Sequence, residues 1–226
     1  MGEYSSDYFF DWLRFANAGM VTRSKIESIE LGVKHVPDNT SIVEIGCFCG
    51  LSTNIIGFFK EAYGKKCPLF CADQWRFEGA ENLNAFIGSS SFITHRQYRE
   101  FVVDTFKRNV LMFSQYDLPY PIEMSSDEFF FLWESNTSVK DVFQRDVQLG
   151  GPLGFCYIDG NHTYAYAHRD FVNSDKHLVT GGFVFFDDSG DDSKWEVKRV
   201  ISEVKASGKY EVIAHNPNYL FKKLRD

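Results

Sequence analysis

The feature that most constrains the fold is a strand–turn–helix unit that repeats along the chain from residue 41 to residue 206. Strands that are buried on both faces of a parallel sheet have nearly continuous apolar runs. Such runs lie at residues 41–45, 68–72, 121–125, 154–158 and 182–186. Amphipathic segments that predict helices follow at about 51–63, 95–112, 126–134, 163–178 and 194–206. The alternation predicts a doubly wound α/β domain.

The C-terminal segment predicts two further strands. Residues 210–214 and 219–222 flank Asn216-Pro217-Asn218, which is a turn signal. A hairpin added to five parallel strands gives a Rossmann-like, seven-stranded sheet with a C-terminal antiparallel hairpin.

The first forty residues have a different pattern. Apolar faces at 7–18 and 23–36 predict two helices, the second of which ends before Pro37. We expect residues 1–40 to form a helical cap that covers a pocket or a dimer seam, or that packs simply on the core. A chain of 226 residues suits one domain, so we predict a single domain with its core at 41–226.

Two stretches interrupt the alternation, at 76–94 and 136–151. Loops of this length in a compact domain often serve as lids. We predict a lid-like insertion at about 76–94, in which Phe77, Phe86 and Phe92 shape an acceptor pocket. A plain surface insertion is the alternative.

Five cysteines are present, at positions 47, 49, 67, 71 and 156. The first four form CxC and CxxxC pairs in place of the paired CxxC knuckles of zinc sites. Most lie within or beside apolar runs, so we interpret them as reduced core residues.

Charge and hydropathy exclude other classes of protein. The formal net charge of −7 argues against a general nucleic-acid-binding surface. No apolar run approaches the length of a membrane-spanning helix, and the polar N-terminus is unlike a signal peptide. We therefore expect a cytoplasmic protein without membrane partners, and the sequence leaves a homo-oligomer open.

The first functional motif lies between the first strand and its helix, at Glu44-Ile45-Gly46-Cys47-Phe48-Cys49-Gly50. Its glycines let the backbone turn tightly and approach a ligand closely. A dinucleotide fingerprint needs GxGxxG, but Glu44 takes the place of its first glycine, and no Gly-Lys-Ser/Thr of a phosphate loop is present. An acid beside the loop favours a ligand that carries positive charge and no phosphate.

Polar residues after the next two strands extend this predicted site. Asp73 ends the second strand, where an acid can accept hydrogen bonds from both hydroxyls of a ribose. Trp75 is expected either to lie against an adenine ring or to anchor the loop. Ser126-Asp127 can reach the adenine edge, although a serine at 125 or 126 equally caps the following helix.

A second motif places acids after the fourth and fifth strands. Asp159 follows the fourth strand, in Tyr157-Ile158-Asp159-Gly160-Asn161-His162, and Asp187 and Asp188 follow the fifth. If these strands are neighbours, three carboxylates meet and repel one another unless something cationic lies among them. An all-oxygen set suits Mg²⁺ or another hard divalent ion, whereas a cap or turn role for Asp187 or Asp188 is the alternative.

The loop and Asp73 together resemble the class I S-adenosylmethionine-dependent methyltransferases. This resemblance implies that Gly46 and Gly50 approach the methionine part and the ribose of the cofactor. The cofactor-binding residues implied are Glu44, Gly46, Cys47, Gly50, Ser52, Asp73, Gln74, Trp75, Ser126, Asp127 and Asp159.

The pair IDGxHxY and FxxDD resembles a narrower group over residues 40–225, the metal-dependent O-methyltransferases of methyltransferase family 24, related to macrolide-sugar and aminocoumarin-sugar tailoring enzymes. The resemblance implies a metal, here Mg²⁺ or a similar ion, on Asp159, Asp187 and Asp188. Some members place a catalytic Asp two residues after the IDG acid, where this sequence has Asn161. That departure leaves His162 as the candidate base, with Asp159 and Asp188 as its catalytic partners; a loop-bracing role for His162 is equally open.

We therefore predict methyl transfer from S-adenosylmethionine to a hydroxyl of a small-molecule acceptor, such as a sugar or natural product, assisted by a divalent ion. A metal-dependent phosphohydrolase, a non-catalytic nucleoside-binding module, and a methyltransferase acting on protein or nucleic acid are the alternatives.

Overall fold

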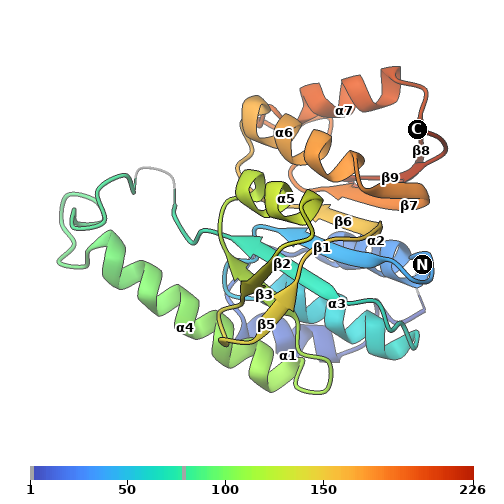
Figure 1. The fold of residues 1–226 in the computed structure, drawn as a ribbon. Helices are drawn as coiled ribbons and strands as arrows, with labels where there is room; N and C mark the ends of the chain where they lie inside the picture. The colour runs from blue at the N-terminus through green and yellow to red at the C-terminus, as the bar shows by residue number, and fades with distance from the viewer. Residues whose placement is uncertain (1–2, 78–79) are drawn as a thin grey trace.

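A seven-stranded sheet forms the centre of the molecule. The computed structural model describes residues 3–77 and 80–226. The strand order is β3-β2-β1-β6-β7-β9-β8, in which β9 pairs antiparallel with both β7 and β8 and the other pairings are parallel (Figure 1). This confirms the predicted sheet and hairpin. The strands are β1 (Ser41–Ile45), β2 (Leu69–Asp73), β3 (Tyr120–Glu123), β6 (Leu153–Ile158), β7 (Leu178–Phe186), β8 (Tyr210–His215) and β9 (Tyr219–Lys223).

Helices cover both faces of the sheet and divide the apolar residues into two cores. Helices α2 (Arg23–Lys34), α3 (Leu51–Ala62) and α4 (His95–Phe113) cover one face. Helices α5 (Ser126–Glu134), α6 (Tyr164–Asp175) and α7 (Val197–Ala206) cover the other. Since α3, α4, α5, α6 and α7 each follow a parallel strand, the loops that lead into them begin at the carboxyl edge of the sheet.

The N-terminal helices belong to the packed body of the protein. Helix α2 packs on α3 and on β7, and α1 (Phe9–Ala16) packs outside α3. Gly32 lies in the last turn of α2, where a Cβ would be 2.7 Å from the ring of Phe155. This close approach brings α2 onto the sheet and carries its first turn toward the carboxyl edge.

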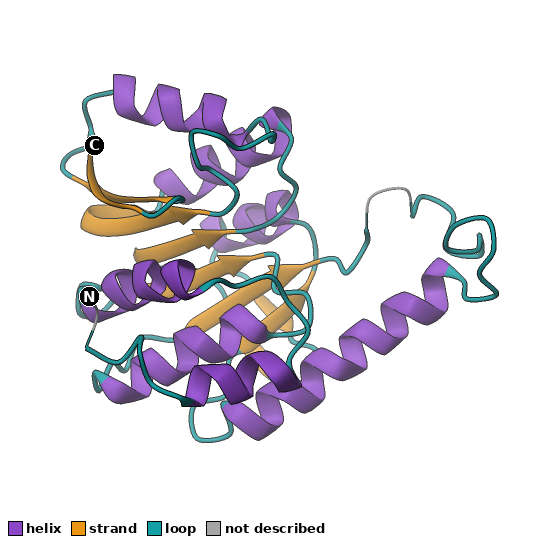
Figure 2. Cartoon of the chain, turned by 180° about the vertical axis from the view of Figure 1, so that it is seen from behind, coloured by secondary structure: helices purple, strands orange, loops and turns teal. Residues whose placement is uncertain are grey.

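In the first irregular stretch, residues 80–94 project from the body together with the start of α4 (Figure 2). Residues 78–79 of this predicted lid lie outside the described part of the chain. Phe86 forms an isolated bridge with Thr94, which caps α4 through a capping box with Gln97. The side chains of Phe86 and Phe92 are exposed, whereas Phe77 packs against Phe48 of the glycine loop.

The second irregular stretch, at 136–151, is not simply a loop. It contains a two-stranded hairpin of β4 (Ser138–Lys140) and β5 (Asp146–Gln148). Three-residue strands with mostly polar side chains give no run for sequence analysis to detect. The hairpin connects the end of α5 to the start of β6. It therefore lies near the amino ends of the parallel strands, whereas the glycine loop lies at their carboxyl ends. None of the described helices is long and apolar enough to cross a membrane.

Candidate functional site

The glycine loop turns through backbone conformations that favour glycine. Gly46 has φ +82° and Gly50 has φ +87°, and Phe48 between them has φ +44°. Gly50 immediately precedes α3. A Cβ on Gly46 would lie 2.2 Å from the carbonyl oxygen of Asp159. The loop is therefore packed directly against the segment that follows β6.

Asp73 fixes the conformation of this loop. One carboxylate oxygen accepts hydrogen bonds from the N–H of Cys47 at 2.9 Å and of Phe48 at 3.0 Å. The other accepts from the N–H of Trp75 at 2.6 Å. Removal from water raises the pKa of Asp73, and these N–H donors act in the opposite direction. The carboxylate thus ties together the two loops that follow β1 and β2.

Glu44 and Ser52 lie beneath the loop, bonded to each other. The Ser52 hydroxyl donates to one oxygen of Glu44, and the Thr53 hydroxyl donates to the other at 2.5 Å. Burial raises the pKa of Glu44 to about 7, although the hydroxyl donors oppose this. Glu44 is fully buried and therefore supports the start of α3 from inside the protein. Cys47, Cys49, Cys71 and Cys156 are buried, whereas Cys67 is half-buried.

Trp75 is a buried anchor in this structure. It is fully buried at φ +47°, and its indole N–H donates to the carbonyl of Phe48 at 2.8 Å. Its ring packs edge-on against Phe106 of α4. These contacts agree with the prediction that Trp75 anchors the loop, rather than with the alternative that it lies against an adenine ring. Gln74, which precedes it, is exposed.

The residues at the start of α5 are engaged by α6. Ser125 caps α5 through a capping box with Glu128. A helix-capping serine at position 125 or 126 was one of the two predicted roles. The Ser126 hydroxyl donates to Asp170, whose pKa burial raises to about 7. Asp127 lies 3.3 Å from Arg169.

The three acids after β6 and β7 do come together. Strands β6 and β7 are parallel neighbours in which Ile158 pairs with Phe186. Asp159 and Asp187 are the next residues of each strand, so both project from the same edge of the sheet. The N–H of Asp187 donates to the carbonyl of Ile158 at 2.9 Å, which fixes this register.

Inside this cluster, both oxygens of Asp187 already have cationic or amide partners. Lys25 Nζ lies 2.6 Å from Oδ2, and Asn218 Nδ2 donates to Oδ1 at 2.6 Å. The Tyr157 hydroxyl donates to Asp159 at 3.1 Å. Burial, together with the negative charge of Asp187, raises the pKa of Asp159 well above its ordinary value.

His162 lies at the open side of the cluster. Its Nε2 is 3.4 Å from Asp188 Oδ2 and 4.0 Å from Asp159 Oδ1, and its ring packs near Trp195. Asp188 has φ +48°, a conformation uncommon for residues other than glycine and often found at functional sites. Asn161 accepts a hydrogen bond from the N–H of Thr163 at 2.9 Å and so orders the start of α6.

The acids do not form a metal-ligand set as they stand. Within residues 3–77 and 80–226, no group of three or more His, Cys, Asp or Glu side chains is placed to hold a metal ion. At Asp187, Lys25 Nζ and Asn218 Nδ2 each lie 2.6 Å from one carboxylate oxygen. The cation that three acids require is thus present, but it is an ammonium group.

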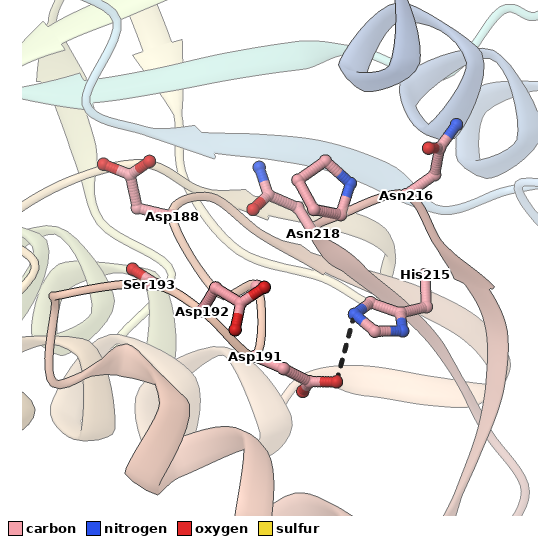
Figure 3. Close-up of a pocket in the computed structure, with 9 residues that line it drawn as sticks. Asp188, Asp191, Asp192, Ser193, His215, Asn216 and Asn218 are labelled. Atoms are coloured by element: carbon pink, nitrogen blue, oxygen red, sulfur yellow. Dashed lines mark ion pairs between the residues drawn. The ribbon is translucent and has the colours of Figure 1, made fainter.

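A cavity of about 460 Å³ opens beside Asp188 (Figure 3). Asp191 on its wall pairs with His215 at 3.7 Å. The cavity lies between the segment after β7 and the β8–β9 turn, and it is lined by none of the described residues of the 76–94 segment (76–77 and 80–94). Its lining residues are Asp188, Gly190, Asp191, Asp192, Ser193, His215, Asn216, Pro217 and Asn218.

Sequence analysis missed three residues of the cluster. Lys25 lies 162 positions before Asp187 and had no local signal. Asn218 was interpreted only as a turn residue, and Tyr157 only as part of an apolar strand. For Tyr157 a signal existed, because a hydroxyl two residues before Asp159 on the same strand points to the same side of the sheet.

The fold and this edge define a Rossmann-like protein with its candidate site at the carboxyl ends of the parallel strands. A family model described as "Methyltransferase domain" (Methyltransf_24) matches residues 43–189, more than half of the chain. The chain therefore belongs to this family of methyltransferases. A search of the curated proteins gives no match.

Solved structures of O-methyltransferases share the fold. The O-methyltransferase NovP has a TM-score of 0.59 at 18% identity, covering 92% of this chain and 82% of NovP. CalS11, a TDP-rhamnose 3′-O-methyltransferase of calicheamicin biosynthesis, has a TM-score of 0.57 at 13% identity, covering 90% and 80%. TomG from Streptomyces achromogenes, solved with S-adenosylmethionine, has a TM-score of 0.54 at 12% identity, covering 97% and 91%.

Proposed function

We propose that this protein transfers a methyl group from S-adenosylmethionine to a hydroxyl of a small-molecule acceptor. The observation that carries the proposal is the contact between Asp73 and the glycine loop, where the carboxylate holds the N–H groups of Cys47 and Phe48. An acid at the tip of the second strand, next to such a loop, is suited to receive the hydroxyls of a ribose.

The charge of the edge supports this cofactor over a nucleotide. Asp73, Asp159 and Asp188 are each only partly buried, and they lie at the carboxyl edge of the sheet, at or just after the ends of β2, β6 and β7. Carboxylates favour a cationic ligand and repel a pyrophosphate. S-adenosylmethionine has a sulfonium, an ammonium and no phosphate. TomG and an O-methyltransferase from Bacillus cereus, which have the same fold, are described as complexes with S-adenosylmethionine and its demethylated product.

The chemistry assigned to this chain is proton removal and orientation. When bound, S-adenosylmethionine supplies an electrophilic methyl group on its sulfonium. His162 takes the proton of the acceptor hydroxyl as the oxygen–carbon bond forms and the carbon–sulfur bond breaks. Asp188, 3.4 Å away, stabilises the imidazolium that results. Asp73 orients the cofactor through its ribose.

The divalent ion implied by the resemblance does not fit the acids in their present arrangement, because the Lys25 ammonium lies 2.6 Å from Oδ2 of Asp187 and would repel a second cation there. The proposed reaction therefore uses no metal ion. Titration of the protein with Mn²⁺ tests the expectation that Asp159, Asp187 and Asp188 bind Mg²⁺.

We further propose that the acceptor occupies the cavity beside Asp188. Its volume of about 460 Å³ lies within the usual range for small-ligand sites. Its carboxylates, its imidazole and the amide of Asn216 suit an acceptor with several hydroxyls. The sugar acceptor in the description of CalS11 supports this class. Residues 76–94 remain a proposed lid over the cofactor side.

A turnover experiment tests the proposal. The protein is incubated with S-adenosylmethionine and a panel of sugars, nucleotide-sugars and phenols, and S-adenosylhomocysteine release is followed by mass spectrometry. Methylation at oxygen of at least one acceptor is expected. Cofactor binding without turnover across a broad panel would instead favour the nucleoside-binding module, and release of phosphate from a phosphomonoester would favour the phosphohydrolase.

A further inference from the structure

A buried ammonium group lies within the carboxylate cluster. Lys25 is on the first turn of α2, and its side chain is 10% exposed. Its Nζ lies 2.6 Å from Asp187 Oδ2 and donates to the carbonyl of Met20 at 3.0 Å. The partner side chain of Asp187 is 5% exposed, so water screens this ion pair little.

This ion pair accounts for the proximity of the acids. Asp187 and Asp159 follow paired positions of adjacent strands, and Asp188 is the next residue along the chain. Carboxylates this close repel one another unless a positive charge lies among them. The ammonium of Lys25 supplies that charge at the most buried of the three, while Asn218 donates to the remaining oxygen of Asp187.

The same contact competes with a divalent ion. Mg²⁺ binds oxygen ligands at about 2.0–2.1 Å in near-octahedral geometry, and it needs free carboxylate lone pairs. An ion on Asp187 would sit beside the Lys25 ammonium in a site that excludes water, where like charges repel strongly. To bind a metal ion here, the ammonium of Lys25 would have to move away from Asp187. This movement would disrupt its hydrogen bonds to Asp187 and to the carbonyl of Met20.

We propose that the ammonium of Lys25 occupies the position of the metal ion in this carboxylate cluster, so that the protein works without a divalent cation. Lys25 is then a positioning residue, because it orients Asp187 and, through it, the cluster that contains Asp159 and Asp188. It also ties the N-terminal helix α2 to the carboxyl edge of the sheet. The inference refines the proposed function, since it assigns the source of positive charge at the same site.

The test measures metal binding by the protein alone. Free Mn²⁺ is titrated by electron paramagnetic resonance in the presence of wild-type protein, Lys25→Met and Lys34→Met. Lys34 is a matched control on the same helix, because it is only half-buried and contacts Glu3 and the ring of Tyr63, away from the carboxylate cluster. The wild type and Lys34→Met are expected to show no binding that depends on the cluster. Lys25→Met exposes three carboxylates without a cation, so its affinity for Mn²⁺ should rise by roughly tenfold or more.

Two results would overturn the inference. One is Mn²⁺ binding by the wild type that Asp188→Asn abolishes. The other is a folded Lys25→Met variant with no gain in affinity. If Lys25→Met does not fold, Mn²⁺ binding by the wild type and by Asp188→Asn is compared instead. Equal and negligible binding by both supports the inference, and binding by the wild type alone contradicts it. Lys25→Arg keeps the positive charge and should behave as the wild type does.

The outcome is separable from that of the proposed function. Mn²⁺ binding needs neither S-adenosylmethionine nor an acceptor, so a protein with no methyl transfer can still support or contradict the role of Lys25. For an active protein, wild-type turnover should be unchanged by a chelator, whereas Lys25→Met should become responsive to added Mg²⁺. A merely structural lysine would give no such metal response.

Discussion

His162 Nε2 lies 3.4 Å from Asp188 Oδ2, between the loop that follows β6 and the one that follows β7. The pair faces the open side of the cluster, and Asp188 is held at φ +48° there. A histidine beside a carboxylate at a strand end can take a proton and keep the resulting charge stabilised. Asp188 is thus a carboxylate partner for His162, the proposed base, although position 161 is an asparagine and not an aspartate.

Replacing His162 tests its role as the base. With an acceptor identified in the turnover screen, His162→Gln should lower kcat by about 10²- to 10⁴-fold, the usual contribution of a general base. S-adenosylhomocysteine affinity should stay within error of the wild type. The control is His168→Gln, since His168 pairs with Glu203 on the surface of α6 and α7. Equal kcat for both variants would remove His162 from the mechanism.

Asp73 should control cofactor affinity. Asp73→Ala leaves the N–H groups of Cys47, Phe48 and Trp75 without their carboxylate, and it removes the proposed ribose acceptor. Hydrogen bonds to a charged group contribute about 1.5–3 kcal/mol each, so affinity for S-adenosylhomocysteine should fall by about 100-fold or more. Calorimetry measures this change. Asp146→Ala, in the exposed β4–β5 hairpin, should leave affinity unchanged.

Two glycines with similar backbones should differ in their tolerance of alanine. Gly46 and Gly64 have φ of +82° and +62°, so alanine at either costs about 1–2 kcal/mol of conformational strain. At Gly46 the new Cβ would also lie 2.2 Å from the carbonyl oxygen of Asp159, whereas Gly64 has open space. Urea unfolding should therefore show Gly46→Ala to be the less stable by a further ~1–3 kcal/mol. Equal stabilities would contradict the packing of the loop on the segment after β6.

Asp170 should make stability depend on pH. Burial raises its pKa from 3.8 to about 7, so the folded state retains a proton that the unfolded chain releases between those values. Stability from this group is present at low pH and is lost as pH rises through about 7, by at most roughly 4 kcal/mol. Asp170→Asn should therefore raise the melting temperature more at about pH 8 than at about pH 5.

The comparison isolates Asp170 because Glu44, whose pKa is also raised to about 7, is unchanged in both proteins. Asp104→Asn, on the exposed side of α4, serves as the control and should show the same small effect at both pH values. A gain from Asp170→Asn that is equal at both pH values would mean that the carboxyl ionises normally in the folded protein.

The sheet was predictable because its strands carry strong local signals. The run Ser41–Ile45 is fully buried, and its predicted limits are those observed. The hairpin of β4 and β5 was not predictable, since only the middle residue of each of its strands turns toward the protein, and a pattern so short has no periodicity.

The residues of the site that could be predicted from the sequence are those that lie at the ends of buried strands. Asp73, Asp159 and Asp187 each follow a buried run, and parallel strands bring such positions to one edge. Their partners were not predictable in the same way. Lys25 reaches Asp187 through the packing of α2 on the sheet, which no local pattern encodes, and Trp75 is buried by α4, on the far side of the 76–94 segment.

Calorimetric titration of the wild-type protein with S-adenosylhomocysteine measures cofactor binding without any knowledge of the acceptor. We expect one site per chain, with binding that survives a chelator and is lost in Asp73→Ala but kept in Asp146→Ala. Absence of any heat of binding at millimolar S-adenosylhomocysteine and S-adenosylmethionine, with the protein folded, would contradict it.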